Sequence, residues 1–254
     1  MARLALHALL VVCVLTAGCS TLGFGPDPTR EERAVGALDN ATAALASTES
    51  YQFESDMTVA VTADGRSEQV DLDLTGAVDA AARKMRSNTT SDGESRRAFV
   101  LNRTVYRECA PPWDGWAVEE RDDDGEWMSQ TPAVRQLSLL ESGSLYWNGT
   151  ETVDGEQAVV LSGEPTADAL TQYQDERSQP VFGGPSIDDV ELRAWLDADT
   201  GRLLRTELRF AVSEGGNTAT VTMTTTFGDY GEPVSVDLPA EAQTDPYELG
   251  CPGE

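Results

Sequence analysis

The amino-acid sequence predicts an α+β fold, in which one leading helix and two central helices accompany a meandering antiparallel sheet within a single domain. Alternation of apolar and polar residues with period two recurs in short runs along the chain and is most regular in the final third. Three other segments have helical spacing. The 254 residues and the hydrophobic content of 40% are sufficient to build one packed core.

The first 18 residues have the pattern of a lipoprotein signal peptide. Arg3 precedes an apolar run over residues 4–17, which is shorter than the about 20 residues that a membrane-spanning helix needs. The run ends in LTAGC at residues 15–19, which resembles a lipobox except that Thr16 stands where an aliphatic residue is usual. We therefore expect lipidation of Cys19 and anchoring to the extracytoplasmic face of the cell membrane. The alternative is an ordinary secreted protein cleaved near Ala17.

The mature chain begins with a lipidated tether over residues 19–29, which is followed by a single domain over residues 30–254. Thr29 and Glu32 have the spacing of a capping box, and Val35, Leu38 and Leu45 follow at helical spacing. Two further helices are expected over residues 132–140 and from Pro165 onwards. Strands are expected over residues 51–63, 70–75, 83–90, 99–101, 104–107, 116–120, 144–147, 150–153, 158–162, 190–196, 204–212, 218–227 and 234–238.

The residue types that remain after cleavage exclude several kinds of enzyme. His7 is the one histidine of the chain and lies in the signal, so histidine-activated nucleophiles and imidazole zinc sites are excluded from the mature protein. Lys84 is the one lysine, which leaves little scope for Schiff-base chemistry. We therefore expect no catalytic residue, no metal ligand and no cofactor. A carboxylate-based hydrolase stays an alternative, because 44 acidic residues are available.

The charge is strongly acidic, with 44 acidic against 18 basic residues and a net charge of −26. Such a surface repels phosphate backbones, so a nucleic-acid partner is not expected. The composition resembles that of haloarchaeal proteins and predicts a fold that needs high salt. The acidic run at residues 122–126 lacks the final glutamate of a calcium loop. Residues 197–201 fit a hairpin turn better than a metal site.

Two cysteines remain in the mature domain, Cys109 and Cys251. An even pair in an exported protein predicts a disulfide, which here would join the C-terminal tail to the middle of the chain. Because the closed loop is long, it would stabilise the fold by about 5 kcal/mol less any strain. Two free thiols are the alternative. Trp113 and Trp116 lie beside Cys109 and could form an aromatic contact surface or pack around the disulfide.

Four Asn-x-Ser/Thr sequons are candidates for glycosylation, at Asn40, Asn88, Asn102 and Asn148. Asn40 falls within the expected leading helix, where modification is less expected than on an exposed loop.

Two stretches of the final third resemble a known group of lipoproteins. They are AWLDADTGRLLRTELRF, which ends at Phe210, and FGDYGEPVSVDLPAE, which begins at Phe227. With the lipidated cysteine and the order of elements, they are similar to the LolA/LolB-like and mycobacterial LppX/LprG-like lipoproteins. The resemblance implies an incomplete, strongly curved antiparallel half-barrel around a few helices. It also implies a concave apolar face that holds a lipid or acyl chain, but no ligand-contacting residue can be carried over by motif.

The leading hypothesis is a membrane-anchored lipoprotein that binds or carries a hydrophobic ligand, such as a lipid or isoprenoid, without catalysis. A cell-surface interaction or sensor module of the same fold, with the concave face filled by its own helix, is the main alternative. No protein partner is identified. The candidate lining of the concave face is apolar and comes from the leading helix and the final third of the chain: Val35, Leu38, Leu45, Val190, Leu192, Leu196, Leu208, Phe210, Val221, Met223 and Phe227.

Overall fold

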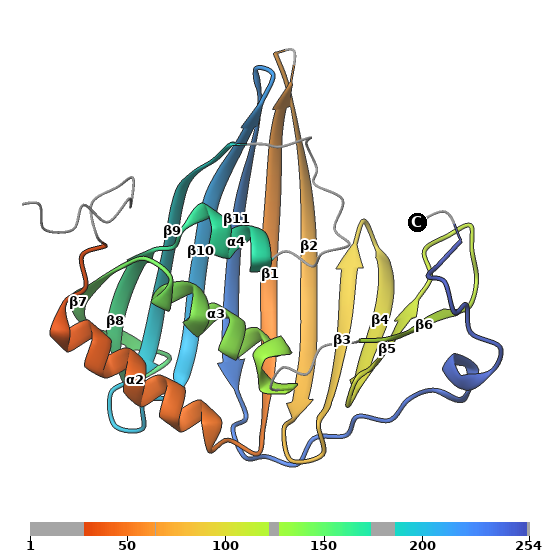
Figure 1. Ribbon diagram of the computed structural model, residues 1–254, viewed down its shortest axis with the longest axis horizontal. Helices are drawn as coiled ribbons and strands as arrows, with labels where there is room; N and C mark the ends of the chain where they lie inside the picture. The colour runs from red at the N-terminus through yellow and green to blue at the C-terminus, as the bar shows by residue number, and fades with distance from the viewer. Residues whose placement is uncertain (1–27, 64, 122–126, 174–185, 253–254) are drawn as a thin grey trace, which may run out of the picture.

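The computed structural model describes residues 28–63, 65–121, 127–173 and 186–252. The expected signal peptide, Cys19, most of the tether and the acidic run at residues 122–126 lie outside this part. The described residues form one open sheet of eleven antiparallel strands in the order β6-β5-β4-β3-β2-β1-β11-β10-β9-β8-β7. The sheet curves around three short helices (Figure 1). The expected α+β half-barrel is therefore confirmed.

The helices are α2 (Glu32–Ala46), α3 (Pro132–Glu141) and α4 (Ala167–Tyr173), and two 3₁₀ turns are η1 (Trp127–Gln130) and η2 (Ala240–Gln243). The strands are β1 (Ser50–Ala63), β2 (Arg66–Asp79), β3 (Lys84–Ser91), β4 (Glu94–Leu101), β5 (Thr104–Glu108), β6 (Trp116–Glu120), β7 (Ser144–Val153), β8 (Glu156–Glu164), β9 (Ser186–Asp197), β10 (Leu203–Glu214) and β11 (Asn217–Gly228).

The sheet consists of two meanders that meet in its middle. Strands β1 to β6 follow one another on one side, strands β7 to β11 do so on the other, and β11 pairs with β1. The residues expected as a hairpin turn, 197–201, do connect β9 to β10. The hairpins β1–β2 and β10–β11 extend above the rest of the sheet (Figure 1).

All three helices lie on one face of the sheet, which we call the inner face (Figure 1). Helix α2 buries Ala34, Leu38, Ala41 and Leu45 against it. These positions recur every three or four residues and so form one stripe of the helix. Small alanines at two of the four positions allow the helix to approach the strands closely.

The expected capping box at the start of α2 is wrong. The helix begins at Glu32 without a side-chain cap, and Thr29 instead lies in the extended segment before it. The Thr29 carbonyl accepts a hydrogen bond of 2.8 Å from the backbone N–H of Leu145 in β7. The Glu31 carboxylate accepts a further one of 2.9 Å from the N–H of Trp147. Pairing with β7 therefore fixes the helix start in place of a local cap.

The expected strand at residues 234–238 is also absent. The chain after β11 instead runs across the opposite, outer face of β3 to β6. There Val236 and Ala242 pack with Phe99 and Trp116 in a small separate core. A side chain that packs on a sheet face satisfies the same apolar alternation as a strand, and this explains the error.

The predicted disulfide between Cys109 and Cys251 is confirmed, with a Cα–Cα distance of 5.5 Å across 142 residues of sequence. Just before Cys251, the chain pairs with the edge strand β6. Val118 donates to the Tyr247 carbonyl at 2.9 Å, and Tyr247 donates to the Trp116 carbonyl at 2.8 Å. The tail thus covers backbone groups of an edge strand that would otherwise invite pairing with another chain.

The core beneath α2 and α3 contains a cluster of four aromatic rings. Tyr51 packs against Phe53, Phe227 and Tyr230 with ring centroids 5.8 to 6.4 Å apart. Burial raises the pKa of Tyr51 to about 12 and also raises the pKa of Tyr230. The Tyr230 hydroxyl donates to the Leu203 carbonyl at 2.6 Å and so joins the end of β11 to β10.

The packing of Phe53 in this aromatic cluster requires a glycine at position 76 of β2. Gly76 lies opposite Phe53 in the register of β1 and β2. A Cβ at this position would lie 2.3 Å from the Phe53 ring and 2.7 Å from the carbonyl oxygen of Arg86. The ring of Phe53 therefore lies over a position that has no side chain.

We predict that Gly76→Ala destabilises the fold by about 1–3 kcal/mol, because the added methyl group overpacks a buried site. Gly36→Ala is the matched control, since a Cβ at Gly36 in helix α2 meets no atom within 4 Å. Alanine there should raise the free energy of unfolding by about 0.5–1 kcal/mol. Urea denaturation of both variants measures the two effects. Equal stability of the two variants would contradict the packing described here.

The raised pKa of Tyr51 predicts a loss of stability at alkaline pH. Below pH 10 the tyrosine is neutral in both the folded and the unfolded chain. Between pH 10 and its folded-state pKa of about 12, it ionises only when the chain unfolds, so stability falls as pH rises. Tyr51→Phe should remove about 2 kcal/mol of the fall in unfolding free energy between pH 9 and pH 12. Denaturant titrations at both pH values test this, with the exposed Tyr247→Phe as a control that retains the wild-type fall.

Candidate functional site

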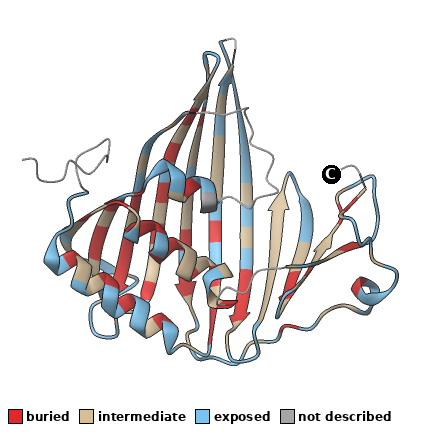
Figure 2. Cartoon of the chain, viewed as in Figure 1, coloured by how far each residue is buried: buried red, intermediate tan, exposed pale blue. Residues whose placement is uncertain are grey.

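The helices cover only part of the inner face and leave an apolar strip on the long central strands. The strip consists of side chains that are half-buried rather than buried: Met57, Val59 and Val61 of β1, Leu72 and Leu74 of β2, and Val221 and Met223 of β11. Figure 2 shows this change along the strands, from buried residues beside the helices to intermediate and exposed residues toward the hairpin tips.

Strand register makes the strip continuous. Met57 lies opposite Leu72 on one side and Met223 on the other, and Val59 lies opposite Val70 and Val221. Because residues two apart point to the same face, these side chains form neighbouring rows across three strands. From Met57 to Val61 the strip is roughly 14 Å long at a rise of about 3.4 Å per residue.

The outer face of the same strands is polar. Thr58 lies between Met57 and Val59 and donates a hydrogen bond of 2.8 Å to the Asp71 carboxylate. Thr222 lies between Val221 and Met223 and is exposed. A strand with polar residues on one face and apolar residues on the other is expected to bury its apolar face. The residues that the structure describes cover this face only in part.

A row of buried polar side chains closes the strip where α3 crosses the sheet. Ser55, Thr225 and Thr206 lie side by side on β1, β11 and β10. Gln136 of α3 lies over them, and all four are at most 5% exposed. We call these four residues the polar row.

The polar row is incompletely hydrogen-bonded. The hydroxyls of Ser55 and Thr225 are 2.7 Å apart, and the Gln136 amide nitrogen donates to Thr225 at 3.3 Å. Among the described residues, however, the Gln136 Oε1 and the Thr206 hydroxyl have no hydrogen-bond partner. Buried polar groups almost always have one, so these two require an explanation.

The structure divides the sequence-predicted lining into two sets. The buried members are part of the core that α2, α3 and the sheet share: Leu38, Leu45, Leu192, Leu196, Leu208, Phe210 and Phe227. The half-buried members pack at the margin of this core: Val35, Val190, Val221 and Met223. Val221 and Met223 are the two that lie on the apolar strip.

Sequence reasoning missed the part of the strip that β1 and β2 contribute. Met57, Val59 and Val61 alternate with polar residues, as do Leu72 and Leu74, so the signal was present in the strand pattern. The alternation showed that these residues share one face of their strands. It did not show that the helices leave this face the least covered.

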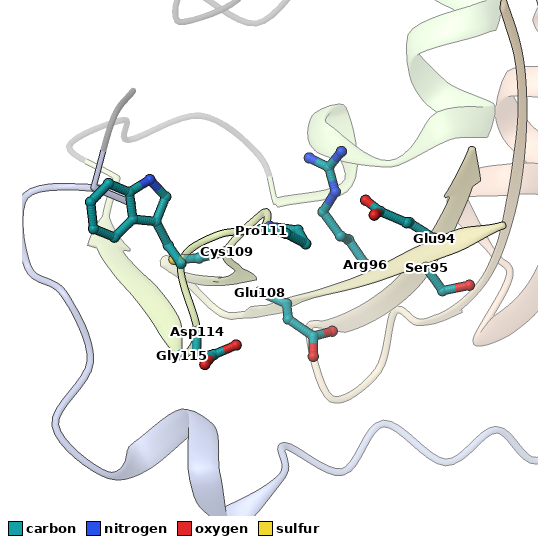
Figure 3. A pocket seen from close by; sticks show the side chains of 9 residues that line it. Glu94, Ser95, Arg96, Glu108, Cys109, Pro111, Asp114 and Gly115 are labelled. Atoms are coloured by element: carbon teal, nitrogen blue, oxygen red, sulfur yellow. The ribbon is translucent and has the colours of Figure 1, made fainter. Parts of the chain in front are cut away.

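A hollow of about 330 Å³ lies beside the disulfide (Figure 3). Four charged side chains are part of its lining, those of Glu94, Arg96, Glu108 and Asp114. Trp113 lies at this hollow and is 46% exposed. Such a lining does not suit an apolar ligand. Trp116, in contrast, is buried against Phe99, with ring centroids 5.8 Å apart.

Two carboxyl groups that lie beside hollows, those of Glu108 and Asp197, have lowered pKa values. Arg97 donates hydrogen bonds to Glu108 and holds the pKa of that carboxyl below its usual range. The hydroxyl and N–H of Thr200 likewise lower the pKa of Asp197, which lies beside another hollow, of about 350 Å³. A general acid in glycoside hydrolysis needs a raised pKa. These two groups therefore do not support the hydrolase alternative.

Three of the sequons lie at exposed positions: Asn40 on α2, Asn102 in the β4–β5 turn and Asn148 on β7. Asn88 on β3 is half-buried.

Within the described ranges, no three metal-ligating side chains are grouped to hold an ion. No helix of the described part is long and apolar enough to cross a membrane.

Comparison with known proteins gives one relative along nearly the whole chain. It is the lipoarabinomannan carrier protein LprG of Mycobacteroides abscessus, which is 25% identical over 241 residues. The alignment covers 94% of this chain and 98% of LprG. No protein-family model matches.

Among solved structures, LppX of Mycobacterium tuberculosis has a TM-score of 0.44 and 17% identity, with 82% of this chain and 100% of LppX covered. LprF of Mycobacterium bovis has a TM-score of 0.41 and 15% identity, with coverages of 84% and 99%. The open, curved antiparallel sheet is the fold expected from the resemblance to LolA/LppX/LprG-like lipoproteins, and the chain is similar to LprG along nearly its whole length.

Proposed function

We propose that the protein is a non-catalytic carrier that holds the apolar part of a lipid, such as an isoprenoid, against the apolar strip. The observation that carries the proposal is the strip itself, a band of half-buried apolar side chains on three neighbouring strands. Covering such a band removes apolar surface from water at about 25 cal/mol for each Å². An elongated hydrophobic molecule matches its shape.

The similarity to LprG supports the proposal, because that relative is a carrier protein by name. The main alternative, an interaction module, requires an inner face filled by the chain's own helix. Helix α2 does fill part of this face, through Leu38 and Leu45. It leaves Met57 and Val59 half-buried outside that core, and this favours the carrier.

We predict that Met223→Glu abolishes lipid binding. A carboxylate on the strip would lose its hydration when a lipid chain covers it, which costs several kcal/mol. Native mass spectrometry of the full chain, followed by organic extraction, should give stoichiometric lipid for the wild type and none for the variant.

Thr222→Glu is the matched control, because Thr222 is the neighbouring residue and is exposed on the outer face. It should retain the wild-type load. A Met223→Glu protein that is folded by circular dichroism and carries as much lipid as the wild type would exclude the apolar strip as the binding face.

The proposal extends to location. We infer that residues 1–18 are a signal peptide, that Cys19 is lipidated, and that residues 19–29 tether a single domain of residues 30–254 to the extracytoplasmic side of the membrane.

The acidic composition, with its net charge of −26, supports function at high salt. Asn102 and Asn148 are the sequons that we expect to be modified first, because both are exposed and lie outside helices.

Cys19→Ala should release the protein from the membrane fraction, because one or two acyl chains supply the attachment. Fractionation of cells that express each form measures this, and Cys13→Ala is the matched control. Equal membrane association of the Cys19→Ala and wild-type proteins would exclude a lipid anchor at this residue.

A further inference from the structure

The polar row indicates what kind of lipid the apolar strip accepts. Ser55 is the next inner-face residue of β1 after Met57, and Thr225 is the next of β11 after Met223. A chain that lies along the strip toward α3 therefore ends at the polar row. The row thus interrupts an otherwise apolar face at its closed end.

Two groups of the polar row, one donor and one acceptor, each lack a hydrogen-bond partner. Thr206 is fully buried, and its hydroxyl can donate one hydrogen bond. Gln136 is 1% exposed, and its Oε1 can accept one. Both residues adjoin Thr225, Thr206 through strand register and Gln136 through the hydrogen bond of 3.3 Å. One free donor and one free acceptor therefore belong to residues that both adjoin Thr225.

We propose, on the basis of the carrier function above, that the ligand is an uncharged lipid with a free hydroxyl group, which the unpaired Thr206 and Gln136 side chains recognise. The Thr206 hydroxyl donates to the ligand oxygen, and the ligand hydroxyl donates to Gln136 Oε1. An ether or ester oxygen can take only the first of these hydrogen bonds.

A charged headgroup does not suit the row. Its four side chains are neutral, and none of them can offset a buried phosphate or carboxylate. Transfer of an unpaired charge to such a site costs far more than a neutral hydrogen-bonded group does.

The test compares oleyl alcohol with oleyl methyl ether, which has the same chain but no hydroxyl donor. Binding of each to the full chain is measured by native mass spectrometry titration. The wild type should bind the alcohol roughly tenfold more tightly, the change that one hydrogen bond to a buried group makes. Gln136→Met, which preserves approximate shape, should reduce that preference to about twofold or less, because only the alcohol can donate to Gln136. Thr206→Val should weaken the binding of both probes roughly tenfold and leave the preference in place, because alcohol and ether oxygens both accept from Thr206. Thr222→Val, on the exposed outer face, should leave it unchanged.

The possible outcomes separate this inference from the carrier function. Equal binding of alcohol and ether by the wild type overturns the inference while the carrier function stands. A preference that persists in Gln136→Met, or undiminished binding of both probes by Thr206→Val, overturns the assignment to the polar row. If the wild type binds neither probe, the carrier function fails and the inference fails with it.

Discussion

Incomplete coverage of one sheet face is the constraint on which the rest of this structure depends. An eleven-stranded antiparallel sheet presents one apolar face, and the helices described on that face have 15, 10 and 7 residues. Their apolar residues share one core with inner-face side chains of β7 to β11 and with Tyr51 and Phe53 of β1. The C-terminal tail could have covered more, but it packs on the outer face instead, where Val236 and the Cys109–Cys251 disulfide hold it. The apolar strip is the part of the inner face that no element of the described chain covers fully.

Much of this architecture follows from local sequence. Each of the eleven strands overlaps a segment that was expected as a strand, and the even number of cysteines predicted the disulfide. The features that were missed depend on contacts between distant residues. Thr29 has the right neighbour for a capping box, yet its backbone pairs with Leu145, and no local pattern contains that information. Residues 234–238 alternate like a strand but have a sheet face, not a strand edge, as their partner.

The candidate site illustrates the same limit. Alternation places Met57 and Met223 on one face of their strands, but only the fold shows that the helices stop short of them. Gln136 is a polar residue on an otherwise apolar helix stripe, which the sequence alone leaves unexplained. In the structure it lies over Thr225, beside the unpaired hydroxyl of Thr206. The apolar strip suits an elongated apolar chain, and the unpaired neutral groups at its end suit a neutral polar group on that chain.

Photo-crosslinking with a diazirine-labelled lipid chain is the most direct test of the central claim, because it reports where on the protein the chain lies. The full-length chain is irradiated with the probe, digested and mapped by mass spectrometry. The account predicts adducts on inner-face residues of β1 and β11, with Met57, Val59, Val221 and Met223 foremost. Adducts confined to the exposed Trp113 and Leu249 near the disulfide, or to the outer face, would contradict it.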